Sequence, residues 1–210
     1  MASGYTPHTP RLKMVDQYIR ELFRDELPAG IEYHNADHTL HSIKGVVAVA
    51  NNLAKLENVS EQDRELIVAA AYFHDTGYIR EYEENEPIAA RMAGRILKLI
   101  GYKPDEIEKV QKMILTTDPE IEPKTHVEKI LCDADLDNLG REDFFQLDER
   151  LREGRRIRGI DVSDDATWYR DTLEFMENHQ YHTESQKKLR EKGKQKNTRE
   201  LIEKLESMKK

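Results

Sequence analysis

The sequence predicts an all-α protein of one compact domain, with about eight or nine helices and a charged helix at the C-terminal end. Apolar residues recur every three or four positions along most of the chain, which is the spacing of one helix face. No stretch alternates apolar and polar residues for long enough to indicate a sheet. With 210 residues, 38% of them hydrophobic, the chain is long enough to bury a core of its own.

The first two predicted helices lie in the N-terminal part of the chain. One follows Pro7 and Pro10 and ends near Pro28 and Gly30, which are the usual start and stop signals. The second runs from about Asp37 to Leu56, with apolar residues at helical spacing. Each helix is therefore expected to turn one apolar face toward the core.

A third predicted helix is apolar on all sides. Ser60 caps its start, and Asp63 completes a variant of the capping box. The run from Leu66 to Phe73 contains no charged residue, and Gly77 follows soon after as a stop signal. A helix that is apolar all round is expected to be largely buried.

Five further helices complete the domain. A fourth has Pro87 in its first turn and runs to Ile100, before Gly101, and a fifth starts at Pro104. The other three are expected at about Val127–Leu136, Arg141–Arg155 and Asp164–Asn178.

The net charge of −8 is distributed unevenly. Residues 187–210 hold ten Lys or Arg against four Glu, which leaves residues 1–186 with 23 positive and 37 negative side chains, a net charge of −14. We therefore divide the chain into a helical domain, 1–186, and a basic helical tail, 187–210, that packs on the domain or extends from it. An acidic body repels nucleic acid, so nucleic-acid binding is expected only through the tail. The composition of the tail also fits a solvated helix, or a helix that forms the contact of a homodimer.

Two further features of the sequence lead us to expect a cytoplasmic protein. Cys132 is the only cysteine, which excludes an intramolecular disulfide framework and any multi-cysteine zinc module. The segment 1–11 lacks the basic-then-apolar pattern of a secretory signal, and the longest apolar run is far short of a membrane span. We therefore expect no membrane partner.

Three clusters of titratable residues carry the functional signal, and the first is a pair of histidines. His34 and His38 lie one helical turn apart, and they share a face if the second helix begins that early. On its own, this spacing is more simply explained by two histidines at a helix start, because it is common by chance.

The second cluster, His74 and Asp75, directly follows the apolar run of the third helix. Burying a bare carboxylate is costly, so this aspartate must be paired, hydrogen-bonded or bound to a cation. The third cluster is Asp133, Asp135 and Asp137, again after an apolar stretch. Three acids at alternate positions cannot share one helix face. We expect Asp135 to point inward, with Asp133 as the alternative, and solvated acids at a helix end explain the same pattern.

Two imidazoles and two carboxylates suit one borderline or hard divalent ion, such as Mn, Fe, Co, Ni or Mg. Four protein ligands leave octahedral positions for water and a substrate oxygen. The clusters therefore predict one divalent metal ion as cofactor, held by a histidine of the first cluster, by His74 and Asp75, and by Asp135 or its alternative Asp133.

The order of these residues on a helical frame resembles the HD superfamily of metal-dependent phosphohydrolases, whose motif is a His, a His-Asp doublet and a distant Asp. The resemblance covers roughly Tyr33 to Gly140. Within it, residues 73–78 and 133–137 are similar to small bacterial members annotated only as predicted phosphohydrolases. The resemblance implies a single HD-type domain that cleaves a phosphoester of a nucleotide or similar small phosphorylated molecule by a metal-activated water, as a phosphomonoesterase or a phosphodiesterase.

The string Tyr-His-Asn-x-x-His also resembles the start of the active site of class I cyclic-nucleotide phosphodiesterases. By that resemblance His38 is a metal ligand, and His34 is the general acid that donates a proton to the leaving oxygen. Asp75 is then both a ligand and the catalytic group that accepts the proton of the attacking water. The Ala134-Asp135 dipeptide is similar to the Ala-Asp that ends the metal set in several relatives, which favours Asp135 over Asp133.

Two departures from the relatives narrow these expectations. Members with two metals carry extra histidines after the doublet, where this chain has residues 85–87 (Asn-Glu-Pro) and 116–117 (Thr-Thr). A second metal site and diiron oxygenase chemistry are therefore not expected. The synthetase-hydrolase branch has acidic catalytic residues right after the doublet, where this chain has residues 76–78 (Thr-Gly-Tyr).

Substrate binding needs cationic and polar partners as well as a metal. Arg80 is nearest to the doublet in sequence, with Arg91 and the tail lysines as alternatives, and Thr117 lies where relatives place histidine. Each of these side chains also fits an ordinary surface or helix-end role. Two other functions remain open: a non-catalytic HD module that binds a nucleotide or partner protein with a structural metal, and an RNA-associated protein that uses its basic tail.

Overall fold

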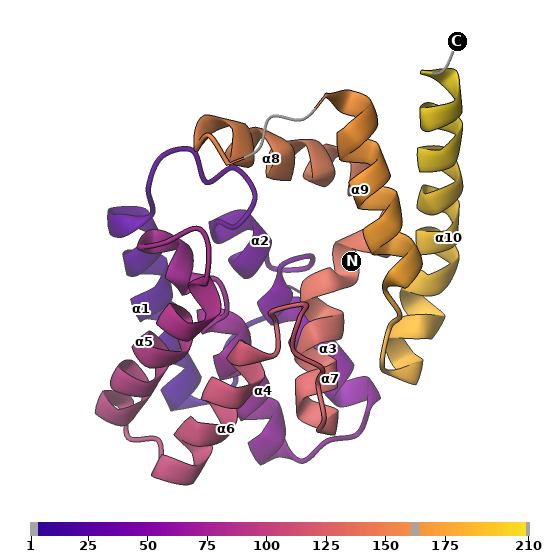
Figure 1. Ribbon diagram of the computed structural model, residues 1–210. Coiled ribbons are helices and arrows are strands. Elements are labelled where there is room, and N and C mark those ends of the chain that lie inside the picture. Colours follow the sequence, from indigo (N-terminus) through magenta and orange to yellow (C-terminus); the bar gives the residue numbers. More distant parts are fainter. Residues whose placement is uncertain (1–3, 161–163, 209–210) are drawn as a thin grey trace.

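The computed structural model describes residues 4–160 and 164–208, and these residues form α-helices and short 3-10 helices without any strand. Ten α-helices lie in the described ranges, one of them only five residues long. The all-α prediction is therefore confirmed (Figure 1). None of the helices in this part of the chain has the length and apolar character needed to cross a bilayer.

The helix α4, Glu61–Phe73, is the centre of the domain. The hydroxyl of Ser60 accepts a hydrogen bond from the backbone N–H of Asp63 at 3.0 Å and donates one to its carboxylate at 2.9 Å, so the predicted cap is confirmed. Every side chain from Leu66 to Phe73 is at most 1% exposed, as the apolar run predicts.

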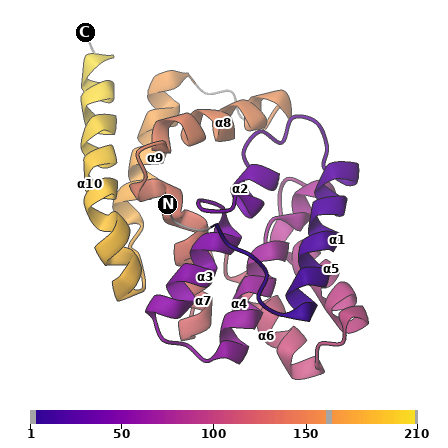
Figure 2. The same ribbon diagram turned by 180° about the vertical axis from the view of Figure 1, so that it is seen from behind.

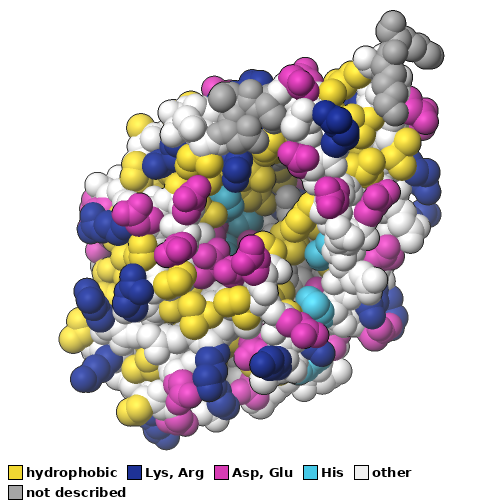
Figure 3. All heavy atoms as spheres, in the orientation of Figure 1, with side chains coloured by type: hydrophobic (Ala, Val, Ile, Leu, Met, Phe, Trp, Pro, Cys, Tyr) yellow, Lys and Arg dark blue, Asp and Glu magenta, His cyan; other side chains and the backbone are white. Residues whose placement is uncertain are grey.

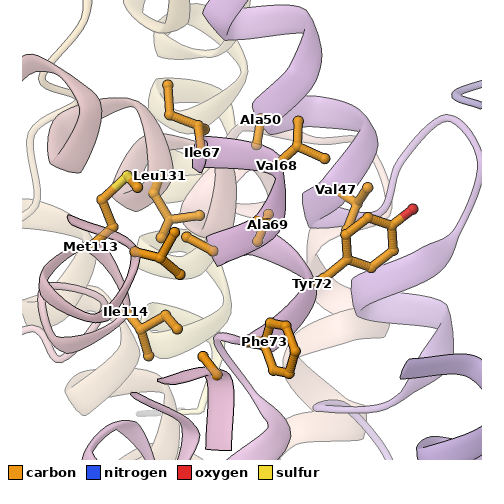
Figure 4. Close-up of a cluster of buried hydrophobic side chains, with 14 of the residues drawn as sticks. Val47, Ala50, Ile67, Val68, Ala69, Tyr72, Phe73, Met113, Ile114 and Leu131 are labelled. Carbon is orange, nitrogen blue, oxygen red and sulfur yellow. The ribbon is translucent and has the colours of Figure 1, made fainter. Parts of the chain in front are cut away.

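Five helices surround α4 and bury it from all sides. They are α1 (Pro10–Glu26), α3 (Val46–Leu56), α5 (Asn85–Ile100), α6 (Pro104–Leu115) and α7 (His126–Asp135). Figure 4 shows how side chains of α3, α6 and α7 close around α4. The labelled residues are Val47, Ala50, Ile67, Val68, Ala69, Tyr72, Phe73, Met113, Ile114 and Leu131. Because α4 is enclosed in this way, the residues that follow Phe73 start from a fixed position.

The single helix predicted over 37–56 is wrong, because the chain there forms two helices. They are α2 (Ala36–Leu40) and α3, separated by the turn 41–45. The Nδ1 atom of His41 accepts hydrogen bonds from the backbone N–H groups of Ile43 and Lys44, at 3.2 and 3.1 Å. A Cβ at Gly45 would lie 2.5 Å from the backbone nitrogen of His41, so the tight turn requires glycine. Side-chain competition for the backbone therefore ends the helix.

The C-terminal helices form a second layer beside this bundle. It contains a 3-10 helix η2 (Leu136–Gly140), then α8 (Phe144–Ile157), α9 (Asp165–Asn178) and α10 (Glu184–Ser207). A smaller apolar cluster holds the layer together, made by Leu139, Phe144, Met176 and Leu201.

The helix α10 packs along α9 and against η2, and both ribbon views show it at one side of the molecule (Figures 1 and 2). A Cβ on Gly193 would lie 2.1 Å from the carbonyl oxygen of Gly140, so the two backbones approach as only glycine permits. The division of the chain at residue 187 stays a prediction.

Acid sensitivity is expected from His179, which ends α9. Burial lowers its pKa to about 4, with Lys194 and His182 acting in the same direction. The unfolded chain takes up a proton near pH 6.5, and the folded chain resists it until about pH 4, so stability falls as the pH drops through this window. We expect His179 to contribute a loss of about 2 kcal/mol in the free energy of unfolding between pH 7 and pH 5.

Urea unfolding at the two pH values measures this loss. The variant His179→Gln should lose this contribution of about 2 kcal/mol, because its side chain does not titrate, whereas the contribution of His34, whose pKa burial also lowers to about 4, stays in both proteins. An equal loss in the variant and in the original protein would contradict the assignment to His179.

Candidate metal centre

Residues of the three clusters predicted from sequence come together at one site. His38 lies on the short helix α2, His74 follows the last residue of α4, and Asp75 precedes the 3-10 helix η1 (Thr76–Ile79). Asp135 is the last residue of α7. The residues therefore enter one site from three separate stretches of the chain.

Four side-chain atoms converge within this site. The Nε2 atom of His38 lies 3.1 Å from Oδ1 of Asp135, 3.4 Å from Nε2 of His74 and 3.4 Å from Oδ2 of Asp75. The Nε2 atom of His74 lies 3.2 Å from the same Asp75 oxygen and 3.3 Å from the same Asp135 oxygen. Ligand atoms about 2.1 Å from one ion and at right angles to each other lie about 3.0 Å apart. The observed spacing could therefore hold a metal ion, and His38, His74 and Asp135 each offer a ligand atom within 4.8 Å of the others.

The hydrogen bonding of His74 shows which of its atoms faces the centre. Its Nδ1 atom lies 2.8 Å from the carbonyl oxygen of Ala71, and a carbonyl oxygen only accepts, so Nδ1 carries the proton. In the neutral ring Nε2 then presents a lone pair to His38 and to both carboxylates. Facing lone pairs repel one another unless a cation or an extra proton lies between them.

The electrostatics of the four residues fit a site for positive charge. The Oδ2 atom of Asp75 is buried without a hydrogen-bond partner, despite its short distances to both rings. Burial opposes charge on His74, but the carboxylates of Asp75 and Asp135 more than offset it and raise the pKa of that ring well above its ordinary value. Burial alone would raise the pKa of Asp135, but the two imidazoles lower it far below the usual range. The donor set of two nitrogens and two oxygens fits a divalent cation.

Asp133 and Asp137, which lie two residues before and after Asp135, bind partners outside the site. Asp133 accepts hydrogen bonds from the backbone N–H groups of His182 and Thr183, at 2.8 and 2.7 Å, and from the Thr183 hydroxyl at 2.6 Å. Asp137 forms an ion pair with Arg190 at 2.7 Å. Both acids thus hold the start of α10, and the structure places Asp135 beside the histidines while Asp133 points elsewhere.

His34 borders the centre, but it does not share a helix face with His38. The helix α2 starts only at Ala36, because the side chain of Asn35 caps it, so His34 precedes the helix. Its ring stacks on Tyr78, with centroids 4.1 Å apart and planes 10° apart, and lies 6.0 Å from the ring of His38. Burial lowers the pKa of His34 to about 4, and the nearby carboxylate of Asp75 acts in the opposite direction.

A cavity of about 460 Å³ opens beside the four converging atoms. Its lining includes His34, Asp75, Thr117 and Asp135, and the Thr117 hydroxyl donates to the carbonyl oxygen of Ile114 at 2.8 Å. In the view of Figure 1, the molecule has a hollow in its surface. Figure 3 shows this hollow with histidine on its floor, hydrophobic side chains on its walls and acidic side chains at its lower rim. A small molecule entering the cavity would therefore meet His34, Asp75 and Asp135.

Arg80, the cationic residue expected to contact the substrate, does not line this cavity. Its guanidinium lies 2.8 Å from a carboxylate oxygen of Glu26, and both side chains are largely exposed. Arg155 of α8 lines the cavity instead, together with aromatic residues of α9 such as Trp168. No local motif marks Arg155, because α8 lies outside the three clusters and its position follows from the packing of the second layer.

Comparison with known proteins gives one family match. A family model described as the HD domain matches residues 18–138, which is more than half of the chain and includes all four converging residues. No curated protein and no solved structure matches the chain.

Metal binding is expected to depend on Asp135. We predict that Mn²⁺ raises the melting temperature of the metal-free protein, because a ligand that binds only the folded state stabilises it. Loss of one of four ligands in Asp135→Ala should weaken Mn²⁺ binding by at least ~100-fold in isothermal titration calorimetry. The matched control is Asp105→Ala, which removes an exposed carboxylate at the start of α6. Equal affinity of Asp135→Ala and the original protein would overturn the assignment.

Proposed function

Since the chain belongs to the HD superfamily of metal-dependent phosphohydrolases, we propose that it hydrolyses a phosphoester of a nucleotide or similar small phosphorylated molecule. One observation supports this function above all: His38, His74 and Asp135 offer ligand atoms within 4.8 Å of one another, the Asp75 carboxylate lies within 3.4 Å of both rings, and both carboxylates line a cavity that a small molecule can enter. The residues proposed to hold a single divalent ion are these four. A buried metal with only a structural role would not need the adjoining cavity.

The proposed reaction transfers a phosphoryl group to water. The P–O bond to the leaving oxygen breaks, a P–O bond to the water oxygen forms, and one water proton passes in net to the leaving oxygen. When bound, a divalent ion would supply positive charge that draws electron density from a phosphoryl oxygen and makes a nearby water more acidic. The ligand types suit Mn, Fe, Co, Ni or Mg.

Asp75 and His34 are proposed to move the protons. Both side chains line the cavity, and the Asp75 carboxylate is charged at neutral pH, so it can accept a proton from the attacking water. His34 is neutral at pH 7 in the free protein, since its pKa is about 4. A phosphate anion beside it would raise that pKa, because negative charge favours the imidazolium. The protonated ring can then donate to the leaving oxygen.

The wider expectations about partners stay predictions. They are a small phosphorylated substrate, nucleic-acid binding only through residues 187–210, a homodimer and a cytoplasmic location. Thr117 lines the cavity and stays a predicted contact for the substrate. The packing of α10 against η2 supports the alternative in which the basic tail packs on the domain.

Hydrolysis is expected to require Asp75. With Mn²⁺, Fe²⁺, Co²⁺, Ni²⁺ or Mg²⁺ present, the protein should release p-nitrophenol from p-nitrophenyl phosphate or from bis-p-nitrophenyl phosphate. Asp75→Asn keeps the shape of the side chain but removes its charge, and it should lower kcat/KM by at least ~100-fold. Asp105→Asn is the control and should leave the rate unchanged. Absence of turnover with every ion would favour a non-catalytic module with a structural metal.

The role of His34 predicts a dependence on the leaving group. A p-nitrophenolate ion leaves readily without a proton, whereas an alkoxide does not. His34→Asn should therefore lower kcat on glycerol 2-phosphate by ~100-fold and on p-nitrophenyl phosphate by less than ~5-fold. Steady-state phosphate release measures both. An equal loss on the two substrates would show that His34 binds or orients the substrate and does not protonate it.

A further inference from the structure

The cavity beside the metal centre has an aromatic wall that begins at the proposed general acid. His34 stacks on Tyr78, and the Tyr78 ring meets Tyr82 with centroids 5.1 Å apart. Tyr33 packs edge-on against His34 at 4.9 Å. These four rings all line the cavity and form a continuous series. The wall therefore presents ring faces and edges to whatever group is attached to a phosphate at the metal centre.

A second part of the lining comes from α8 and α9, outside the part of the chain matched by the family model. Leu147, Leu151, Trp168 and Phe175 line it. The indole N–H of Trp168 donates to the Asp148 carboxylate at 2.9 Å, so the ring is held in one orientation. Together the two parts line the cavity with many apolar and aromatic side chains, which is the kind of site that binds flat apolar groups.

The charges of the cavity limit how many phosphate groups fit it. Arg155 is the only Lys or Arg among the residues that line it, and no hydrogen bond or ion pair is found for its side chain in the described ranges. Beyond the metal centre the lining holds three acids, Glu86, Asp148 and Asp171. One phosphate can be neutralised by the metal centre and Arg155, but each further phosphate would meet carboxylates without a matching cation.

We propose that this cavity selects phosphoesters that carry one phosphate group and a flat aromatic body, with Arg155 as the cationic residue that contacts the phosphate. The inference rests on the proposed phosphohydrolase function and names the substrate class for the same site. The ring of the substrate lies between the Tyr78 side and the Trp168 side, and its phosphate lies toward Asp75 and Asp135. Polyphosphate esters and small alkyl phosphates are both disfavoured, the first by charge and the second by the loss of ring contacts.

Trp168 provides a direct binding signal because it is the only tryptophan in the chain and lines the cavity. Benzylphosphonate and methylphosphonate are suitable probes, since their C–P bond is not an ester. In the Mg²⁺-loaded protein, benzylphosphonate should change the Trp168 fluorescence and bind at least ~10-fold more tightly than methylphosphonate. Equal affinity of the two probes would overturn the aromatic part of the proposal.

Three variants separate the charge from the ring contacts. Arg155→Met should weaken the binding of both phosphonates by ~10-fold. Arg156→Met is the matched control, because Arg156 is the next residue of α8 and does not line the cavity. Phe175→Ala should reduce the preference for benzylphosphonate and leave methylphosphonate binding unchanged, and its side chain is 38% exposed, so the fold tolerates the change. A normal affinity of Arg155→Met would overturn the role of Arg155.

Hydrolysis of four substrates tests the same selectivity in the intact protein. We expect kcat/KM to be highest for 1-naphthyl phosphate and at least ~10-fold lower for glycerol 2-phosphate, choline phosphate and ATP. A preference for ATP, or for choline phosphate in a cage of rings and acids, would overturn the substrate class. If benzylphosphonate binds as expected and no ester is hydrolysed with any metal, the cavity proposal stands and the proposed phosphohydrolase function fails.

Discussion

The mutual approach of four electron-rich atoms in a buried place is the constraint on which the rest of this structure depends. Two imidazole nitrogens and two carboxylate oxygens lie 3.1 to 3.4 Å from their neighbours, and their lone pairs face one another. Such a group is unfavourable unless positive charge is present, because a low-dielectric interior strengthens repulsion. The fold must therefore hold the residues there against their repulsion, and it does so with rigid helices rather than flexible loops.

The helix α4 supplies most of that rigidity. Its last two turns are sealed by neighbouring helices, so His74 and Asp75 emerge from a segment that cannot shift without disturbing the core. Asp135, the acid that faces the histidines, is held in a similar way from the other side. Asp133 and Asp137, its alternate neighbours, are bound to residues at the start of α10. The second layer thus both builds a wall of the cavity and fixes the acid that faces the histidines.

Part of the fold could be predicted from residue patterns alone, because these patterns reflect interactions between residues close together in the chain. The apolar run of α4 and the cap at Ser60 follow from hydrophobic spacing and backbone hydrogen bonding within a few residues. The continuous helix expected over 37–56 failed because His41 bonds to its own following backbone, and this local competition has no strong signature in hydrophobic spacing. Arg80 was misjudged as a cavity residue for a related reason, since proximity along the chain does not fix the direction of a side chain.

The sequence by itself determined the helical class, the buried central helix and the residue types that suit a divalent metal, since composition and periodicity encode these directly. Only the tertiary structure decided that Asp135 faces the histidines while Asp133 binds α10, and that Arg155, Trp168 and Phe175 border the site. The physical reason is that these relations join residues from different helices. Their distances depend on how whole helices pack, and packing is a property of all the side chains together.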